Sequence, residues 1–188
     1  MKTALLVIDV QMALAHDDAN GAERSCPQAA ENISLLLAAF REHGDTIVHV
    51  HHHGTDQNDP FHHDAPGVAV QPFAMPVGDE LVMIKHVSSA FSGSTLETDL
   101  RAEGIERVVL CGATANHCVE SATRAASDLG FDTVYAADAV WAYAVTGPDG
   151  VEHTAEQVHS TSLSTLAGEF ASVLKTKQIL SQWAPTGH

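Results

Sequence analysis

Cysteine is scarce in this chain of 188 residues. Only three cysteines occur, at positions 26, 111 and 118, and no two of them form a Cys-x-x-Cys pair. An odd number of scattered cysteines excludes a disulfide-stapled fold and is typical of a protein kept in a reducing compartment. One of these thiols is therefore free to have a chemical role.

Basic residues and long apolar runs are also few. Nine Lys and Arg face 24 Asp and Glu, a formal net charge of −15 at pH 7. Such a surface repels phosphate backbones and anionic lipids, so we expect neither nucleic acid nor a membrane as a partner. No apolar run approaches the roughly 18 residues of a membrane span, and the first segment lacks the pattern of a secretion signal. The sequence predicts a cytoplasmic protein.

Short β-rich runs alternate with helical patterns along the chain, and no internal repeat is present. The length predicts a single domain over residues 1–188. The alternation predicts an α/β fold with a parallel sheet covered by helices on both faces. Strands are expected at 3–8, 46–51, 80–84, 107–111, 133–137 and 171–174, helices at 27–43, 94–103, 115–129 and 152–166, and a long loop at 52–79.

Three chemically useful residues follow expected strand ends. Asp9 closes the first strand, Lys85 the third, and Cys118 follows the fourth after a short small-residue turn. In parallel sheets ligands bind at the carboxyl ends of the strands, near the point where strand order reverses. Alone, each residue has a plainer explanation: a turn cap, a solvated lysine and a small buried side chain. Together they indicate a catalytic site at one edge of the sheet.

Cys118 is expected in the first turn of a helix. Unpaired N–H groups and the positive end of the helix dipole lie there, and Lys85 adds positive charge. These features predict a thiol pKa below the usual value, so that the thiol is partly ionised at neutral pH. The same N–H groups are suited to hold an oxyanion, and the turn Gly112-Ala113-Thr114 is small enough for close approach of a substrate.

Three segments resemble motifs of one family. Residues 5–11 (LLVIDVQ) resemble the opening motif of isochorismatase-like hydrolases, residues 84–91 (IKHVSSAF) their lysine motif, and residues 111–119 (CGATANHCV) their nucleophile motif. The motifs occur in the family's order and at similar spacing. The resemblance covers nearly the whole chain, from about residue 3 to 180.

The resemblance implies a three-layer α/β/α sandwich with a six-stranded parallel sheet of order 3-2-1-4-5-6. It implies Asp9 as base, Lys85 as its helper and Cys118 as nucleophile, without any cofactor. A cis peptide bond is implied between Ala113 and Thr114, with the amides of Thr114 and Cys118 aimed at one oxyanion. A homo-oligomer is also expected, because neighbouring subunits often complete the pockets of this family.

Four further residues are candidates for the substrate pocket. Gln11 either orients Asp9 or lines the pocket, Phe91 and Trp141 are either pocket walls or core residues, and His117 is either a pocket or a helix-surface residue. A histidine cluster raises the question of a metal, which the related nicotinamidases carry. Because three histidines stand where those enzymes show Asp-x-His, we expect no metal here, and the histidines either line the pocket or belong to a solvated loop. The cluster comprises His49, His51, His52, His53, His62 and His63.

The predicted function is hydrolysis of a small amide or related C–N bond through a thioester. Three alternatives stay open at this point. A metal-bearing nicotinamidase would use the histidine cluster, and an isochorismatase would cleave a vinyl ether without the cysteine. A non-catalytic binding protein on the same fold is the third, and the combination of Asp9, Lys85 and Cys118 speaks against it.

Overall fold

A six-stranded parallel sheet forms the centre of the protein in this computed structural model, which describes residues 1–183. The last five residues of the domain expected over 1–188 lie outside the described part. The strand order β3-β2-β1-β4-β5-β8 confirms the predicted topology, with β8 as the sixth parallel strand. The strands are β1 (Thr3–Ile8), β2 (Thr46–His52), β3 (Leu81–Lys85), β4 (Arg107–Ala113), β5 (Asp132–Trp141) and β8 (Ser172–Leu174).

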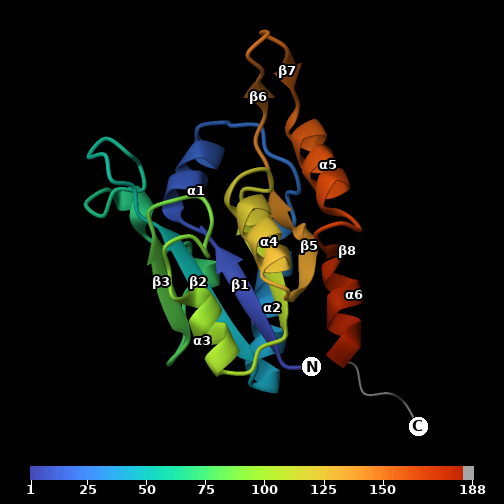
Figure 1. Ribbon diagram of the computed structural model, residues 1–188. Coiled ribbons are helices and arrows are strands. Elements are labelled where there is room, and N and C mark those ends of the chain that lie inside the picture. The colour runs from blue at the N-terminus through green and yellow to red at the C-terminus, as the bar shows by residue number, and fades with distance from the viewer. Residues whose placement is uncertain (184–188) are drawn as a thin grey trace.

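Helices cover both faces of this sheet, as expected for an α/β/α sandwich (Figure 1). Buried side chains of α3, α4 and α5 belong to the core on one face, and those of α1, α2 and α6 to the core on the other. The helices are α1 (Met12–Ala19), α2 (Ala29–His43), α3 (Leu96–Ala102), α4 (Cys118–Asp128), α5 (Ala155–Leu166) and α6 (Thr176–Leu180).

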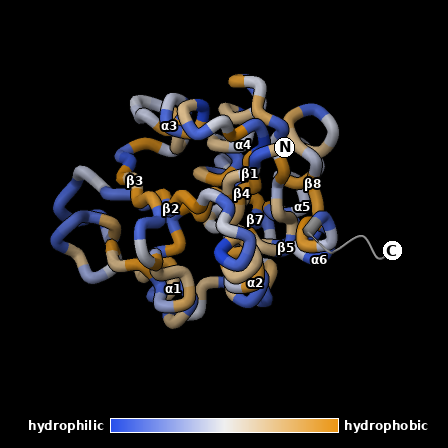
Figure 2. Tube along the Cα trace, turned by 90° about the horizontal axis from the view of Figure 1, so that it is seen from below, coloured by the Kyte–Doolittle hydropathy of each residue, from blue (hydrophilic) through white to orange (hydrophobic). Residues whose placement is uncertain are grey.

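The distribution of apolar residues explains why the sheet lies at the centre of the protein. All six residues of β1 are buried, as a strand covered by helices on both faces requires. Helix α2 places Ile33, Leu36, Leu37 and Phe40 against the sheet and ends at Gly44, whose φ of 68° is readily adopted only by glycine. Viewed along the layers, apolar segments gather at the centre and polar ones at the periphery (Figure 2).

Several parts of the fold differ from the sequence prediction. The short helices α1 and α6 were not expected, β5 continues to Trp141, and α4 begins at Cys118 instead of residue 115. Residues 152–153 form a strand instead of the first turn of the predicted helix 152–166. This strand, β7 (Glu152–His153), pairs with β6 (Val145–Thr146) in a hairpin that projects beyond the sheet (Figure 1). Helix α5 begins only after Thr154, whose side chain accepts from Gln157 N in a capping box.

The second part of the long loop between β2 and β3 contacts the start of α1, where Met12 N donates to Ala69 O at 2.7 Å. It contains two single-turn 3-10 helices, η1 (Pro66–Val68) and η2 (Pro72–Ala74), and a third such helix, η3 (Ser181–Trp183), follows α6. At the edge where this loop lies, β1 is flanked by β2 on one side and β4 on the other, so strand order reverses there.

Within residues 1–183, no helix has both the length and the apolar character that crossing a bilayer requires.

Candidate active site

Asp9 stands directly after β1, at the reversal of strand order. Its φ of 51° lies in the left-handed region, which Asp tolerates better than most residues. Its backbone N–H donates to Val50 O at 2.8 Å, and its side chain is buried. The backbone therefore turns at the end of the strand and holds the carboxylate in a buried position at the edge of the sheet.

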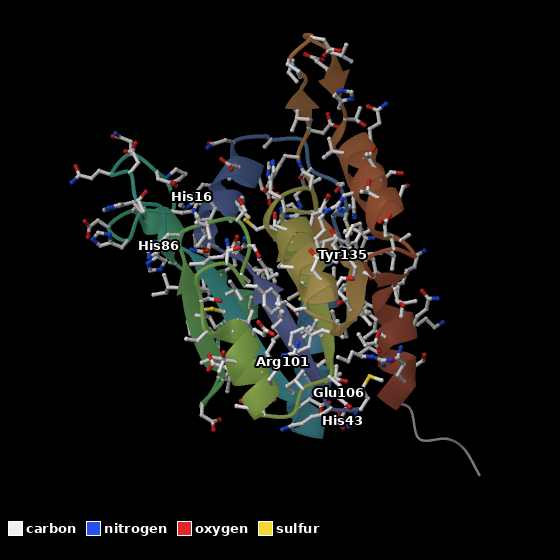
Figure 3. All side chains as sticks on the ribbon, viewed as in Figure 1. His16, His43, His86, Arg101, Glu106 and Tyr135 are labelled. Carbon is white, nitrogen blue, oxygen red and sulfur yellow. The ribbon has the colours of Figure 1, made fainter. Side chains whose placement is uncertain are left out.

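Lys85 contacts both of the other predicted catalytic residues, Asp9 and Cys118. It is the last residue of β3 and only 3% exposed. Its ammonium donates to Asp9 Oδ2 at 2.8 Å and to Cys118 Sγ at 3.3 Å, and it lies 3.4 Å from His52 Nδ1. The next residue, His86, is visible at the end of β3 beside the long loop (Figure 3). One ammonium thus bridges a carboxylate and a thiol that are 109 positions apart in the sequence (118 − 9).

A tight turn carries β4 to Cys118, the first residue of α4. Gly112 has a φ of 117°, and a Cβ there would overlap the Ile8 carbonyl oxygen, so only glycine allows β4 to run this close to β1. The Ala113–Thr114 peptide bond is cis, in agreement with the expectation from the family resemblance. This turn places the thiol at the helix N-terminus and above the carboxyl end of β1.

A small cavity opens over the thiol. Its volume is about 160 Å³, below the ~300 Å³ at which sites for drug-sized ligands begin. Two apolar side chains and two imidazoles form walls around the carboxylate and the thiol, so both reactive groups are accessible to a small molecule. The lining residues are Asp9, Leu14, His52, Phe61, Ala113, Thr114, His117 and Cys118.

Burial controls the charges in this site. It raises the pKa of Asp9, and Lys85 offsets this only in part. Burial, followed by the neighbouring Asp9 charge, raises the pKa of Cys118 to about 12. The prediction of a partly ionised thiol is therefore wrong for the resting site: Lys85 is shared with a carboxylate that repels a thiolate. The thiol needs a base, and Asp9 Oδ1 is buried without a hydrogen-bond partner in the described residues.

Three of the four predicted pocket residues do not line the cavity. Gln11 is fully buried and holds His52, donating to its carbonyl oxygen at 2.9 Å and accepting from its N–H at 2.8 Å. Phe91 packs beside Phe131 in the core. Trp141 is 1% exposed in the opposite core, with the Arg24 guanidinium 4.3 Å from its ring centroid. Only His117 lines the cavity.

Two walls of the cavity were not predicted from the sequence. Leu14 lies on the unpredicted helix α1, and Phe61 lies in the long loop. His52 belongs to the histidine cluster, for which pocket lining was one of the expected roles. Phe61 packs edge-on against the His52 ring, with centroids 5.6 Å apart. An apolar residue within a long polar loop was the one signal that could have indicated Phe61.

The structure separates the histidines of the cluster. His49 is buried and bonded to Glu80, whereas His52 faces the cavity. In residues 1–183, one group of three potential metal-ligand atoms lies within 4.8 Å: His62, His63 and Asp64, of which the last two are exposed. None of these three lines the cavity. The Asp-x-His pattern of nicotinamidases thus has no counterpart beside the thiol, and the residues there do not fit that metal.

Comparison with known proteins decides the family. The isochorismatase domain matches residues 3–178. The chain belongs to the isochorismatase family. Within this family, it is 36% identical over 185 residues to the uncharacterized isochorismatase family protein YrdC of Bacillus subtilis, covering 98% of each chain. The family resemblance seen in the sequence is thereby confirmed.

Solved structures and a further relative agree with this assignment. The crystal structure from Chromobacterium violaceum described as a hydrolase of the isochorismatase family superposes with a TM-score of 0.91, at 35% identity, covering 96% of this chain and 92% of that one. Maleamate amidohydrolase of Pseudomonas putida is 28% identical over 157 residues, 74% of this chain and 72% of its own. The chain therefore has the fold of isochorismatase-family hydrolases.

Proposed function

We propose that the protein is a cysteine-dependent amidohydrolase that cleaves a small amide through a thioester on Cys118. One observation carries the proposal: the Lys85 ammonium contacts both Asp9 Oδ2 and Cys118 Sγ, at 2.8 and 3.3 Å, and Asp9 and Cys118 both line a small cavity. A nucleophile, a base and a charge that serves both are the parts that covalent amide hydrolysis requires.

The first half of the reaction forms the thioester. Asp9 takes the thiol proton, and the negative charge moves from the carboxylate to the sulfur within reach of the same Lys85 ammonium. The thiolate attacks the amide carbon, and N–H groups of Thr114 and Cys118 at the start of α4 stabilise the oxyanion. Asp9 then returns the proton to the nitrogen, the C–N bond breaks and ammonia or an amine leaves.

The second half releases the acid. Water enters the position of the departed amine, gives a proton to Asp9 and attacks the thioester carbon. The C–S bond breaks and the proton returns to the sulfur. The raised pKa of Asp9 favours both steps, because it narrows the gap between the pKa of the base and that of the thiol.

Ammonia release from a panel of small amides tests the proposal. Cys118→Ala should lower turnover of an accepted amide by at least about 10⁴-fold, since the covalent route is lost. Cys26→Ala is the matched control: Cys26 lies outside the cavity, and turnover should stay within about twofold of wild type. Wild-type turnover by Cys118→Ala would eliminate the thioester route. Nicotinamide belongs in the panel, with and without a chelator, because metal-dependent activity would favour the nicotinamidase alternative.

We further propose that the working form is a homo-oligomer. Strand β3 is an edge strand, and three of its five residues are apolar and at least 40% exposed: Leu81, Val82 and Ile84. Monomeric proteins usually protect such an edge with charge or proline. Light scattering at micromolar concentration should give a multiple of 19.9 kDa. Val82→Lys should lower that mass, and a monomeric wild type would contradict the proposal.

A further inference from the structure

The cavity over Cys118 contains little free positive charge. Among residues 1–183, those that line it include neither Arg nor Lys. Lys85 reaches the site from β3, but its ammonium is occupied by Asp9, Cys118 and His52. Within this chain, any cation for a substrate would therefore have to come from the two histidines in the wall.

His52 is neutral in this arrangement. The Lys85 ammonium can only donate, so the contact of 3.4 Å makes His52 Nδ1 an acceptor that carries no proton. Burial, and to a smaller extent the Lys85 charge, lowers the pKa of His52. Both effects favour the neutral imidazole. The imidazole thus offers a substrate at most one neutral N–H group, at Nε2.

His117 is engaged by its own neighbours. Its Nδ1 lies 3.2 Å from Thr114 Oγ1, and its Nε2 lies 3.4 Å from Asn116 Nδ2. Both ring nitrogens are therefore occupied by polar groups of the same turn. His117 thus supplies shape and polarity to the cavity wall, with neither ring nitrogen left over for a carboxylate.

The remaining wall is apolar and the space is small. Leu14 and Phe61 face the reactive groups, and the volume of about 160 Å³ equals that of about five water molecules in the liquid. A carboxylate placed here would lose its hydration without gaining a cation. The Asp9 charge and the net charge of −15 repel it further.

We propose that the substrate is a small uncharged primary amide, and that the cavity rejects amides that carry a carboxylate. The inference rests on the proposed amidohydrolase function and narrows it to a substrate class. Because this selectivity follows from the chemistry of the cavity wall, we expect it for every amide that is small enough to enter the cavity.

Diamides and their half-hydrolysed products give a nearly isosteric test. Succinamide and water yield succinamate and ammonia, and the product differs from the substrate only by a carboxylate in place of one amide. We expect ammonia release to stop at one equivalent per diamide, with kcat/KM for succinamate lower on the order of 100-fold. Malonamide and fumaramide, with their monoamides, provide two further pairs. Release of two equivalents at similar rates would overturn the inference.

A variant of the cavity wall separates charge from shape. His117→Arg adds a cation, and the ratio of kcat/KM for succinamate to that for succinamide should rise at least about tenfold. His117→Gln, which stays neutral, is the matched control and should leave this ratio unchanged. An unchanged ratio in His117→Arg would show that charge is not the cause of rejection. Loss of discrimination in 0.5 M NaCl would assign it to long-range repulsion and overturn the role of the cavity.

The outcomes distinguish this inference from the function on which it rests. Efficient hydrolysis of succinamate that disappears in Cys118→Ala leaves the amidohydrolase standing and refutes the selectivity. Absence of ammonia from every pair counts against the amidohydrolase itself, and the selectivity falls with it.

Discussion

The two ends of strand β3 each carry an ion-pair cluster, partly exposed at Glu80 and buried at Lys85, and the two clusters shift the pKa of their carboxylate in opposite directions. Glu80, just before β3, meets Arg41 and His49, whereas Lys85, at its end, meets Asp9 and Cys118. Both clusters combine an acid, a base and a third titratable group. In the second cluster, Asp9 and Cys118 line the cavity described above.

The number of donors explains the difference. Glu80 accepts two bonds from Arg41, at 2.6 and 2.9 Å, one from Val77 N and one from His49. Burial opposes its ionisation, yet these donors hold its pKa down to about 2. Asp9 has Lys85 on one oxygen, and among residues 1–183 its other oxygen has no hydrogen-bond partner, so burial prevails and its pKa is raised. Glu80, whose two oxygens both accept hydrogen bonds, stabilises the fold. Asp9, which has fewer donors, remains available as a base.

The largest effect should come from neutralising the acid of each cluster in turn. Asp9→Asn should lower kcat/KM by about 10²–10⁴-fold, because no group takes the thiol proton. Glu80→Gln is the matched variant: it should retain activity and lose stability. Equal activity losses in both variants would remove the distinction between the clusters.

The next effect concerns the thiol beside Asp9. With its pKa raised to about 12, Cys118 should react with iodoacetamide about tenfold faster for each unit of pH between 7 and 9, because the thiolate fraction grows in that proportion. Mass spectrometry after brief labelling measures this rate at each cysteine. Cys111, which is fully buried, provides the internal control and should stay unlabelled in the native protein. A plateau for Cys118 near neutral pH would instead indicate a resting ion pair.

A smaller effect is expected in the stability of Glu80→Gln. Loss of the charge that Arg41 and His49 contact should cost about 1–3 kcal/mol at pH 7, at the lower end because solvent screens part of the cluster. The folded pKa of about 2 lies below the ordinary 4.5. The deficit should therefore be complete above about pH 5 and shrink as pH falls toward 2. Urea denaturation at several pH values measures it, and a deficit independent of pH would point to lost packing.

Arg41→Lys should give the smallest change. It keeps the charge but removes the two-bond contact with Glu80, so we expect a loss of about 0.5–1 kcal/mol and no change in kcat/KM. Lys85→Arg, the corresponding change at the other end of β3, should impair turnover strongly because a guanidinium does not fit between Asp9 and Cys118. If Arg41→Lys and Lys85→Arg both left stability and turnover unchanged, neither cluster would depend on the geometry of its cation.

The sequence by itself determined the architecture and the identity of the reactive groups. Apolar runs such as 3–8, alternating with helical stripes such as that of α2, require a parallel sheet with two covered faces. Topology then carries the residues after β1, β3 and β4 to one edge. Asp9, Lys85 and Cys118 could be selected because strand ends are readable from local pattern. The hairpin β6–β7 was missed because two-residue strands leave too short a pattern.

Only the tertiary structure decided the protonation states and the walls of the site. The helix start and Lys85 suggested an ionised Cys118, but burial and Asp9 raise its pKa, and both depend on segments distant in sequence. Phe91 and Trp141 belong to the cores, while Leu14, His52 and Phe61 form the cavity. Solvation and Coulomb energies depend on distances through space, which local sequence pattern does not specify.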